Sequence, residues 1–188
     1  MAKLTGGNIA NVERIKIELE GEETATSYVF ETATSCTFTA AVSSGQEVEQ
    51  RVKNALCGMI KTDDIVKGYD IELEDQRLIA EVLALVDGGT LETAESGSGG
   101  WTKYTAPVIG TAVERKPFTL TMYTSDRNAD GDAIEYYAWE FKACRGKPVG
   151  GSSADNQFTN MKYTIQSRPA FGVSPMTVSR VEELPAVA

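Results

Sequence analysis

The chain has 188 residues, 41% hydrophobic and 24% charged, as in an ordinary folded protein of one domain or two small ones. Its 18 basic and 27 acidic residues give a net charge of −9, which argues against a protein that grips nucleic acid through a basic face. Histidine is absent, which excludes Ser-His and Cys-His catalytic pairs and histidine-bound metals.

Two strand regions are predicted in the first part of the chain. Over 12–20, Ile15, Ile17 and Leu19 alternate with charged residues, the period of a half-buried strand. A turn is expected at Gly21-Glu22-Glu23, and residues 25–42 are rich in β-formers. One face of that second region is expected to carry Cys36, Phe38, Ala40 and Val42.

Residues 46–60, within a long polar segment at 43–66, fit two patterns. Val48, Val52 and Leu56 follow helical spacing, but the charged residues between them fit the polar face of a strand. We favour a strand or a long hairpin arm, followed by a turn at Thr62-Asp63-Asp64. We therefore expect one domain, 1–188, with an arm or loop at about 43–66 that becomes ordered against a neighbouring molecule.

The clearest predicted strand, over 68–75, leads directly into the predicted helix. Its face opposite Tyr69, Ile71 and Leu73 is a row of carboxylates, which repel one another unless water or a partner's cations reach them. That row comprises Asp70, Glu72 and Glu74. A helix is expected over about 76–87, because apolar residues recur at helical spacing from Leu78 to Val86.

The sequence also suggests how this helix is bounded. Asp75 is a suitable N-cap, Arg77 and Glu81 are spaced as an i,i+4 ion pair, and Gly88-Gly89 is a suitable left-handed C-cap.

The C-terminal half alternates strands with two loops rich in Gly and Ser, at 94–100 and 146–156. Strands are predicted at 118–123, 133–144, 161–165 and 176–181. In the second of these, one face is expected to carry Tyr137, Trp139, Phe141 and Ala143. The fold class is therefore mainly β, a two-layer antiparallel sandwich or barrel with one flanking helix. Its sheet edges must be hidden by closure, by charge or by pairing between subunits.

No motif in the sequence specifies catalysis or a cofactor, so we expect a protein that is not an enzyme and binds none. Asp126–Asp132 resembles the start of a calcium loop, but Tyr137 stands where the bidentate Glu belongs, so a hairpin turn is favoured. Gly97–Gly100 lacks the Lys-Ser/Thr of a phosphate loop. Trp101 and Trp139 could stack on sugars, although single tryptophans on strands more often belong to a core or an interface.

Signals of cellular location are few. Residues 1–7 contain no apolar stretch, and the most apolar segment, 78–86, is too short to span a bilayer, so no membrane association is expected. Three widely spaced cysteines, Cys36, Cys57 and Cys144, fit reduced thiols of a protein made in a cytoplasm.

The run from Gly68 to Asp75, leading into Leu78–Gly89, resembles the strand-to-helix core of tail tube (major tail) proteins of long-tailed bacteriophages and phage-tail-like particles. The resemblance is sharpest over about 67–90 and is pattern rather than motif elsewhere. It implies a β-sandwich-like subunit of stacked hexameric rings, with strands lining a lumen, a helix outside and a loop reaching a neighbouring ring.

The resemblance also implies partners and a location. The partners are further copies of the chain and the tape-measure, baseplate or tail-tip and terminator proteins. DNA passes through the tube without specific binding, and the protein belongs to the virion tail, assembled in the host bacterial cytoplasm.

The uneven charge of the chain suggests which residues face such a lumen. Residues 1–94 hold 8 basic and 17 acidic side chains, whereas 95–188 hold 10 of each. A duct for DNA must not bind phosphate, so carboxylates or neutral groups suit its wall. The candidate lumen-facing residues are Asp70, Glu72, Glu74, Glu18 and Glu20.

The same residues also fit other placements of the acidic face and other functions. The acidic face could lie on the outer wall, or serve only solubility. The chain could instead be a monomeric β-sandwich module that binds a carbohydrate or another ligand, or a small hydrolase that uses a carboxylate pair.

Overall fold

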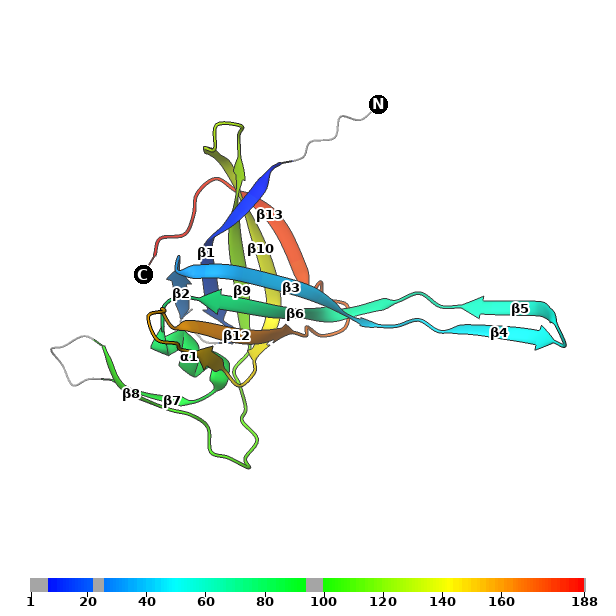
Figure 1. Cartoon of the computed structure of the whole chain (residues 1–188), viewed down its shortest axis with the longest axis horizontal. Coiled ribbons are helices and arrows are strands. Elements are labelled where there is room, and N and C mark those ends of the chain that lie inside the picture. The colour runs from blue at the N-terminus through cyan, green and yellow to red at the C-terminus, as the bar shows by residue number, and fades with distance from the viewer. Residues whose placement is uncertain (1–6, 22–25, 94–99, 188) are drawn as a thin grey trace.

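The computed structural model describes residues 7–21, 26–93 and 100–187 (Figure 1). The turn predicted at Gly21-Glu22-Glu23, the loop at 94–100 and the segment Gly97–Gly100 lie largely outside these residues, and most of the N-terminal start does too.

Strands dominate the described residues, so the mainly β prediction is confirmed. The strands are β1 (Ile9–Leu19), β2 (Ser27–Phe30), β3 (Ala33–Ser43), β4 (Glu47–Val52), β5 (Ala55–Lys61), β6 (Ile65–Asp75), β7 (Thr90–Thr93), β8 (Trp101–Thr105), β9 (Phe118–Arg127), β10 (Ala133–Gly146), β11 (Gly150–Ser152), β12 (Asn160–Ser167) and β13 (Met176–Val181). The predicted region 25–42 is therefore two strands, and β7, β8 and β11 fall where no strand was predicted.

Nine strands form one antiparallel sheet that folds over on itself. Its order is β2-β1-β9-β10-β12-β6-β3, with β13 on β10 and β11 on β12. Most of β10 pairs with β9, whereas its last residues, Cys144–Gly146, pair with β12. Figure 1 shows the two halves crossing, with β1, β9, β10 and β13 steep and β3, β6 and β12 nearly horizontal. The apolar side chains lie between these halves, as predicted for a two-layer structure.

A β-bulge in β10 marks the bend between the two halves. The register with β9 shifts between Phe141 and Cys144, and Ala143 adopts φ 49. The prediction that Ala143 continues the face of Tyr137, Trp139 and Phe141 is therefore wrong. The extra residue of the bulge changes the alternation, and Cys144 takes the buried position instead.

The core confirms the period-two alternation of the predicted strands. Ile15, Ile17, Ile71 and Leu73 are fully buried. Aromatic rings fill the space beside them: the centroid of Phe38 lies 5.3 Å from that of Phe141 and 5.5 Å from that of Trp139. Tyr69 packs edge-on against Phe141 at 5.7 Å. These separations are those of favourable aromatic pairs.

The helix α1 (Ala80–Asp87) starts later than the predicted 76. Strand pairing prevails over helical propensity here, because the N–H of Gln76 donates to the carbonyl of Thr32 and Ile79 is still extended. Asp75 is a buried strand residue whose Oδ1 accepts the N–H of Arg77 at 3.0 Å, so it is not the N-cap. The helical Arg77–Glu81 pairing is also wrong, since Arg77 precedes the helix.

The end of the helix agrees with the sequence. Gly88 has φ 82 and its N–H donates to the carbonyl of Ala84, as expected of a left-handed C-cap. Val82, Leu83 and Val86 are buried against the sheet, so α1 flanks the β layers as predicted. In the described part of the chain, no helix is long and apolar enough to cross a membrane.

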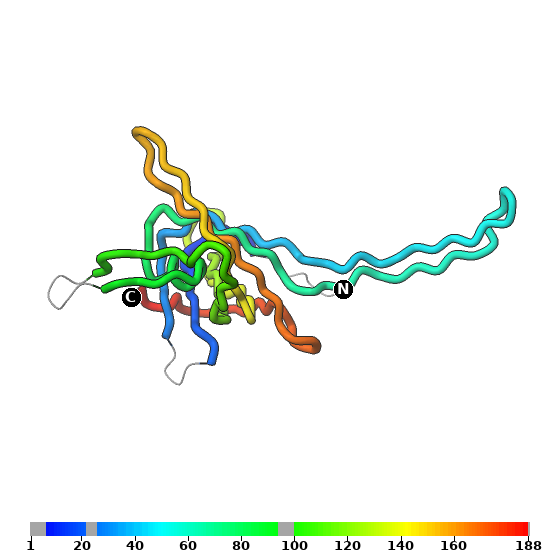
Figure 2. The backbone as a smooth tube through the Cα atoms, turned by 90° about the horizontal axis from the view of Figure 1, so that it is seen from below, coloured from blue at the N-terminus to red at the C-terminus, as the bar shows by residue number. Residues whose placement is uncertain are grey.

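Strands β4 and β5 pair with each other and project far from the body, continuing the direction of β3 and β6 (Figures 1 and 2). The strand interpretation of 46–60 is thus the observed one. The turn predicted at Thr62-Asp63-Asp64 is wrong. The chain passes straight through these residues. The N–H of Thr62 donates to the carbonyl of Gln46, the N–H of Gln46 donates to the hydroxyl oxygen of Thr62, and the carboxylate of Asp64 accepts the N–H of Gly45. The hairpin turns at Lys53-Asn54 instead.

Replacing Phe141 by Ala should lower the free energy of unfolding by about 3–5 kcal/mol, because a fully buried ring contacting Phe38 and Tyr69 is lost. Denaturant unfolding of the isolated chain measures this change. Phe171→Ala is the matched control, since Phe171 is fully exposed and its loss should cost under about 0.5 kcal/mol. Equal losses in the two variants would contradict the assigned core.

Candidate functional site

The acidic row on β6 faces away from the core. Asp70, Glu72 and Glu74 alternate with the buried Ile71 and Leu73, so their side chains point outward. Their strand neighbours in register are small or polar: Ser35, Thr37 and Thr39 on β3, and Lys162, Thr164 and Gln166 on β12. We call this outer surface the β6 face. Its side chains carry carboxylates, hydroxyls, one amide and one amine.

Cations of the same chain neutralise two of these carboxylates. Arg168 Nη2 lies 2.6 Å from Asp70 Oδ1, and Lys162 Nζ lies 2.6 Å from Glu74 Oε1. Partial burial acts to raise the pKa of Asp70, but hydrogen bonds from Gln166 and Arg168 and the charges of Arg168 and Lys147 hold it below its usual range. The repulsion expected within the row is thus relieved without a partner molecule.

Glu72 differs from its two neighbours. It is exposed, and it faces Thr37 on one side and Thr164 on the other. Among the described residues it has no ion-pair partner. Glu72 is therefore the carboxylate of the β6 face whose charge is most available to molecules outside the chain.

Glu18 and Glu20 do not join this row. Glu18 lies in β1 and Glu20 directly follows it, in the other half of the sheet, so their side chains and the β6 face lie on opposite sides of the core. Glu18 pairs with Lys16 at 2.9 Å. Glu20 accepts the hydroxyl of Thr119 at 2.7 Å and the N–H of Ala143 at 3.0 Å, and so holds the bulge of β10.

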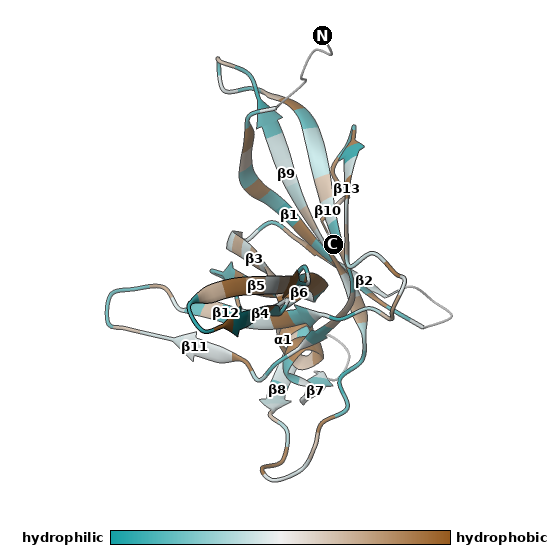
Figure 3. Cartoon of the chain, turned by 90° about the vertical axis from the view of Figure 1, so that its right-hand side faces the viewer, coloured by the Kyte–Doolittle hydropathy of each residue, from teal (hydrophilic) through white to brown (hydrophobic). Residues whose placement is uncertain are grey.

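The projecting hairpin, which we call the arm (residues 44–64), exposes apolar side chains along its length. Val48 and Ile60 are paired in register and therefore share one face, with exposed fractions of 57% and 70%. Val52, Leu56 and Met59 are also more than half exposed. In Figure 3, where the arm is seen end on, β5 is largely in the hydrophobic colour. None of these residues reaches the core of its own chain.

A groove of about 500 Å³ lies at the other end of the molecule. Strand β2 and the residues after it form one wall, the start of α1 forms another, and Trp101 completes it. Its apolar lining includes Leu78 and Trp101, which are 43% and 41% exposed. Glu31, Arg77 and Glu81 stand at its rim, all exposed.

The segment Asp126–Asp132 is a hairpin turn between β9 and β10, as favoured from the sequence. Asn128 organises it: its side-chain oxygen accepts the N–H groups of Asp130 and Asp132, and its carbonyl accepts that of Gly131. Asp126 accepts the N–H of Asn8. Within the described residues no group of three potential ligands is placed to hold a metal.

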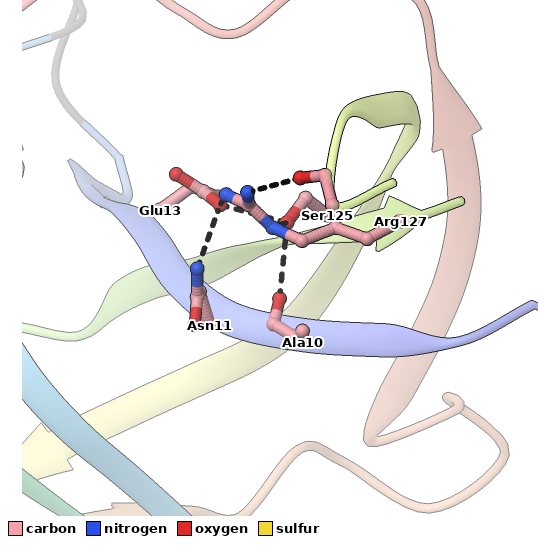
Figure 4. A network of polar contacts seen from close by, with 6 residues as sticks. Ala10, Asn11, Glu13, Ser125 and Arg127 are labelled. Atoms are coloured by element: carbon pink, nitrogen blue, oxygen red, sulfur yellow. Dashed lines mark hydrogen bonds and ion pairs between the residues drawn. The ribbon is translucent and has the colours of Figure 1, made fainter. Parts of the chain in front are cut away.

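A polar network at the start of β1 was not predicted from the sequence (Figure 4). Glu13 Oε1 accepts the hydroxyl of Ser125 at 2.7 Å and the guanidinium of Arg127 at 2.9 Å, and Ser125 also donates to the carbonyl of Ala10. The network spans the register shift between β1 and β9, where Asn11 has φ 56. Its members are far apart in sequence, so only the fold brings them together.

The cysteines and the second tryptophan show no sign of a reactive site. Burial raises the pKa of both Cys36 and Cys144 to about 12, which disfavours the thiolate. Cys57 is exposed on the arm. Trp139 packs against the core, and its indole N–H donates to Thr124 at 3.0 Å.

Comparisons with known proteins give remote likenesses only. No protein-family model matches the chain, and no curated protein matches it. A chain in the cryo-EM structure of the anti-feeding prophage cap (AFP tube terminating cap) aligns at TM-score 0.47 and 10% identity, covering 96% of this chain and 97% of that one.

Two further solved structures give similar values. One is the PVC sheath-tube complex of an extracellular contractile injection system in the extended state, with TM-score 0.45, 11% identity and coverage of 91% of each chain. The other is the AFP baseplate, with TM-score 0.41, 9% identity and coverage of 95% and 97%. Because these three TM-scores are below 0.5, the likenesses carry no argument about function.

Replacing Glu13 by Gln should lower the free energy of unfolding by about 1–3 kcal/mol at neutral pH, since a charge-assisted network is lost. The hydrogen bond from Ser125 lowers the pKa of Glu13. Partial burial acts to raise this pKa, but hydrogen bonds from Arg127 and Asn11 and the charge of Arg127 lower it further. A lowered pKa in the folded state gives stability that is present above the ordinary value of 4.5 and lost as pH falls through the folded value.

The gap between wild type and Glu13→Gln should therefore close as the pH falls below 4.5, which chemical denaturation at a series of pH values can measure. Glu114→Gln, at an exposed carboxylate, is the control and should change stability little at any pH. A gap of constant size down to low pH would show that the Glu13 charge contributes nothing.

Proposed function

We propose that this chain is a structural subunit that assembles with copies of itself into stacked hexameric rings, forming the tube of a phage tail or tail-like particle. The observation that carries the proposal is the arm. A two-stranded hairpin is marginal on its own in water, and this one leaves a row of large apolar side chains uncovered. Such a surface gains stability when a neighbouring subunit covers it.

The edges of the sheet support the same proposal. Strands β2 and β3 stand at the two ends of the main path of the sheet, so each has one strand neighbour in that path. Unpaired edges favour strand addition by another chain. A closed ring of subunits satisfies both edges, whereas a monomer leaves them to water.

The β6 face is the proposed wall of the lumen. Its cations are held in ion pairs with Asp70 and Glu74, so they are poorly available to bind phosphate, and Glu72 repels it. On the opposite outer surface, Glu18 pairs with Lys16 and Glu140 with Lys142. Glu20 accepts hydrogen bonds from Thr119 and Ala143, so each of these three carboxylates has a partner, unlike Glu72. We therefore assign the lumen to the β6 face, with Glu18 and Glu20 outside it.

The wider assignment follows from this role. The partners are other copies of the chain, tape-measure, baseplate or tail-tip and terminator proteins, and DNA that passes without specific binding. The subunit is not an enzyme, and it is assembled in the host bacterial cytoplasm and then carried in the particle.

A monomeric ligand-binding module is the second candidate function. The groove beside Trp101 favours it, because a half-exposed indole in an apolar groove can stack on a sugar ring. Negative-stain microscopy and sedimentation of the purified chain distinguish the two: rings or tubes support the structural role, whereas a stable monomer that binds a glycan supports the module.

Removing the arm should convert assembling protein into soluble monomers. Ser43 and Ile65 are paired in register, so replacing residues 44–64 by an Asn-Gly turn closes the β3–β6 ladder without disturbing it. Sedimentation velocity should show loss of rings and polymers while circular dichroism keeps its β-sheet signal. Tubes of normal length after the deletion would refute the proposed role of the arm.

A matched variant tests whether assembly depends on the apolar side chains of the arm and not only on the presence of the hairpin. Val48→Thr with Ile60→Thr keeps β-branched residues at the same pair of positions but weakens burial against a neighbour. Assembly should then require a higher protein concentration than in wild type.

Reversing Asp70, Glu72 and Glu74 to Lys should leave tubes intact but slow DNA release from particles that contain the variant. The change adds unpaired cations along the proposed wall, and each such cation can hold a phosphate by counterion release. The rate of DNA release, followed by a fluorescent DNA dye at two salt concentrations, measures the effect, and the delay should shrink at higher salt.

The corresponding variant of the opposite surface is Glu18→Lys with Glu140→Lys, which should leave the rate of release unchanged. If this variant delays DNA and the β6 variant does not, the lumen lies on the β1 side.

A further inference from the structure

The arm and the groove have complementary chemistry, and among the described residues Lys53 of the arm and Glu31 and Glu81 of the groove have no ion-pair partner in their own chain. Building on the proposed self-assembly, we infer that the tip of the arm (residues 50–56) of one copy docks in the groove between β2 and α1 of the next copy. The deciding observations are the charges and apolar side chains at the two places and their positions at opposite ends of the molecule.

The tip is basic and apolar, although the chain as a whole is acidic. It carries Arg51 and Lys53 and no carboxylate, whereas the whole chain has a net charge of −9. Arg51 is held by Glu49 at 2.7 Å, but Lys53 has no ion-pair partner in the described residues. Val52 and Leu56 beside it are each 56% exposed. The tip thus presents one unpaired cation between two apolar side chains.

The groove offers the opposite combination. Its apolar lining beside Trp101 and Leu78 can accept aliphatic side chains, and its volume of about 500 Å³ is in the range of small binding sites. Glu31 and Glu81 stand at its rim, and neither forms an ion pair with another described residue. A lysine entering between them would find two carboxylates and one arginine, Arg77.

The arm cannot reach the groove of its own chain. Figures 1 and 2 place the arm at one end of the long axis and the elements of the groove, β2 and α1, at the other. A contact between unlike surfaces at opposite ends is heterologous, so each copy that docks leaves a free arm or a free groove for the next. Such a contact either closes into a ring or continues as an open stack of copies, and both occur in an assembly of stacked rings.

The conformation of Lys53 adds an independent argument. It has φ 53 at the two-residue turn of the hairpin, a left-handed position where Gly or Asn is less costly. A lysine there destabilises the turn, and strain of this kind is often found where a residue has a functional use. An ion pair with the next copy supplies that use.

A charge exchange tests the contact in the whole chain. Lys53→Glu and the double change Glu31→Lys with Glu81→Lys should each raise the critical concentration for polymerisation about tenfold, because like charges then meet. The triple variant that combines them restores opposite charges and should recover most of the loss. Sedimentation velocity measures all four proteins, and thermal unfolding checks that each is folded.

Two further variants serve as controls. Lys53→Gly relieves the left-handed turn yet removes the charge, so it should keep the arm folded but still weaken polymerisation. Asp130→Lys changes the charge by the same amount as one of the Glu→Lys changes, on the exposed β9–β10 turn away from arm and groove, and should have no effect.

The outcomes separate this inference from the proposed function. A wild-type chain that never polymerises would overturn both. A second outcome would overturn this inference alone. Wild type would polymerise and the arm deletion would not, but the triple variant would assemble no better than the weaker of Lys53→Glu and the Glu31→Lys, Glu81→Lys double variant. The arm would then dock elsewhere. Polymerisation that is indifferent to the groove variants would likewise overturn it and leave the groove to another occupant.

Discussion

The fold depends on one strand changing partners. Most of β10 pairs with β9 and β13, but its last three residues pair with β12, and the bulge at Ala143 lies at the change. Glu20 fixes this point by accepting both the Ala143 N–H and the Thr119 hydroxyl. Without the bend, the two halves of the sheet would not pack on each other, and apolar side chains of both, such as Ile17 on β1 and Ile71 on β6, would stay in water. The cost of one left-handed alanine is thus offset by the burial of two sheet faces.

This bend also decides what is left over for function. Because the apolar faces of both halves are turned inward, the outer surfaces can be polar, as on the β6 face. The same closure leaves the β4–β5 hairpin, which continues β3 and β6, free to run beyond the body as the arm. The apolar side chains there have no layer of their own chain to pack against. In the proposed assembly, a neighbouring copy would cover these side chains.

The sequence predicted the elements better than their boundaries. Alternation located β1, β6, β9, β12 and β13, because residues such as Ile15 and Ile71 face a core on one side only. It failed where tertiary contacts prevail: Gln76 stays bonded to Thr32, so the helix begins late, and the bulge at Ala143 reverses a pattern that local sequence cannot reveal. The carboxylate row was predicted, but not its neutralisation, since Lys162 and Arg168 become neighbours only through the pairing of β12 with β6. The groove and the Glu13 network likewise join segments too distant for any spacing rule.

The way in which the arm is attached has a mechanical consequence. Its strands continue β3 and β6 directly, so a pull along the arm runs parallel to the strands and across their hydrogen bonds. Those bonds are then loaded together in shear rather than opened one after another from an end. A particle whose subunits are joined through such hairpins could bear axial tension without unravelling its protomers, and the joint between copies would yield before the sheet does.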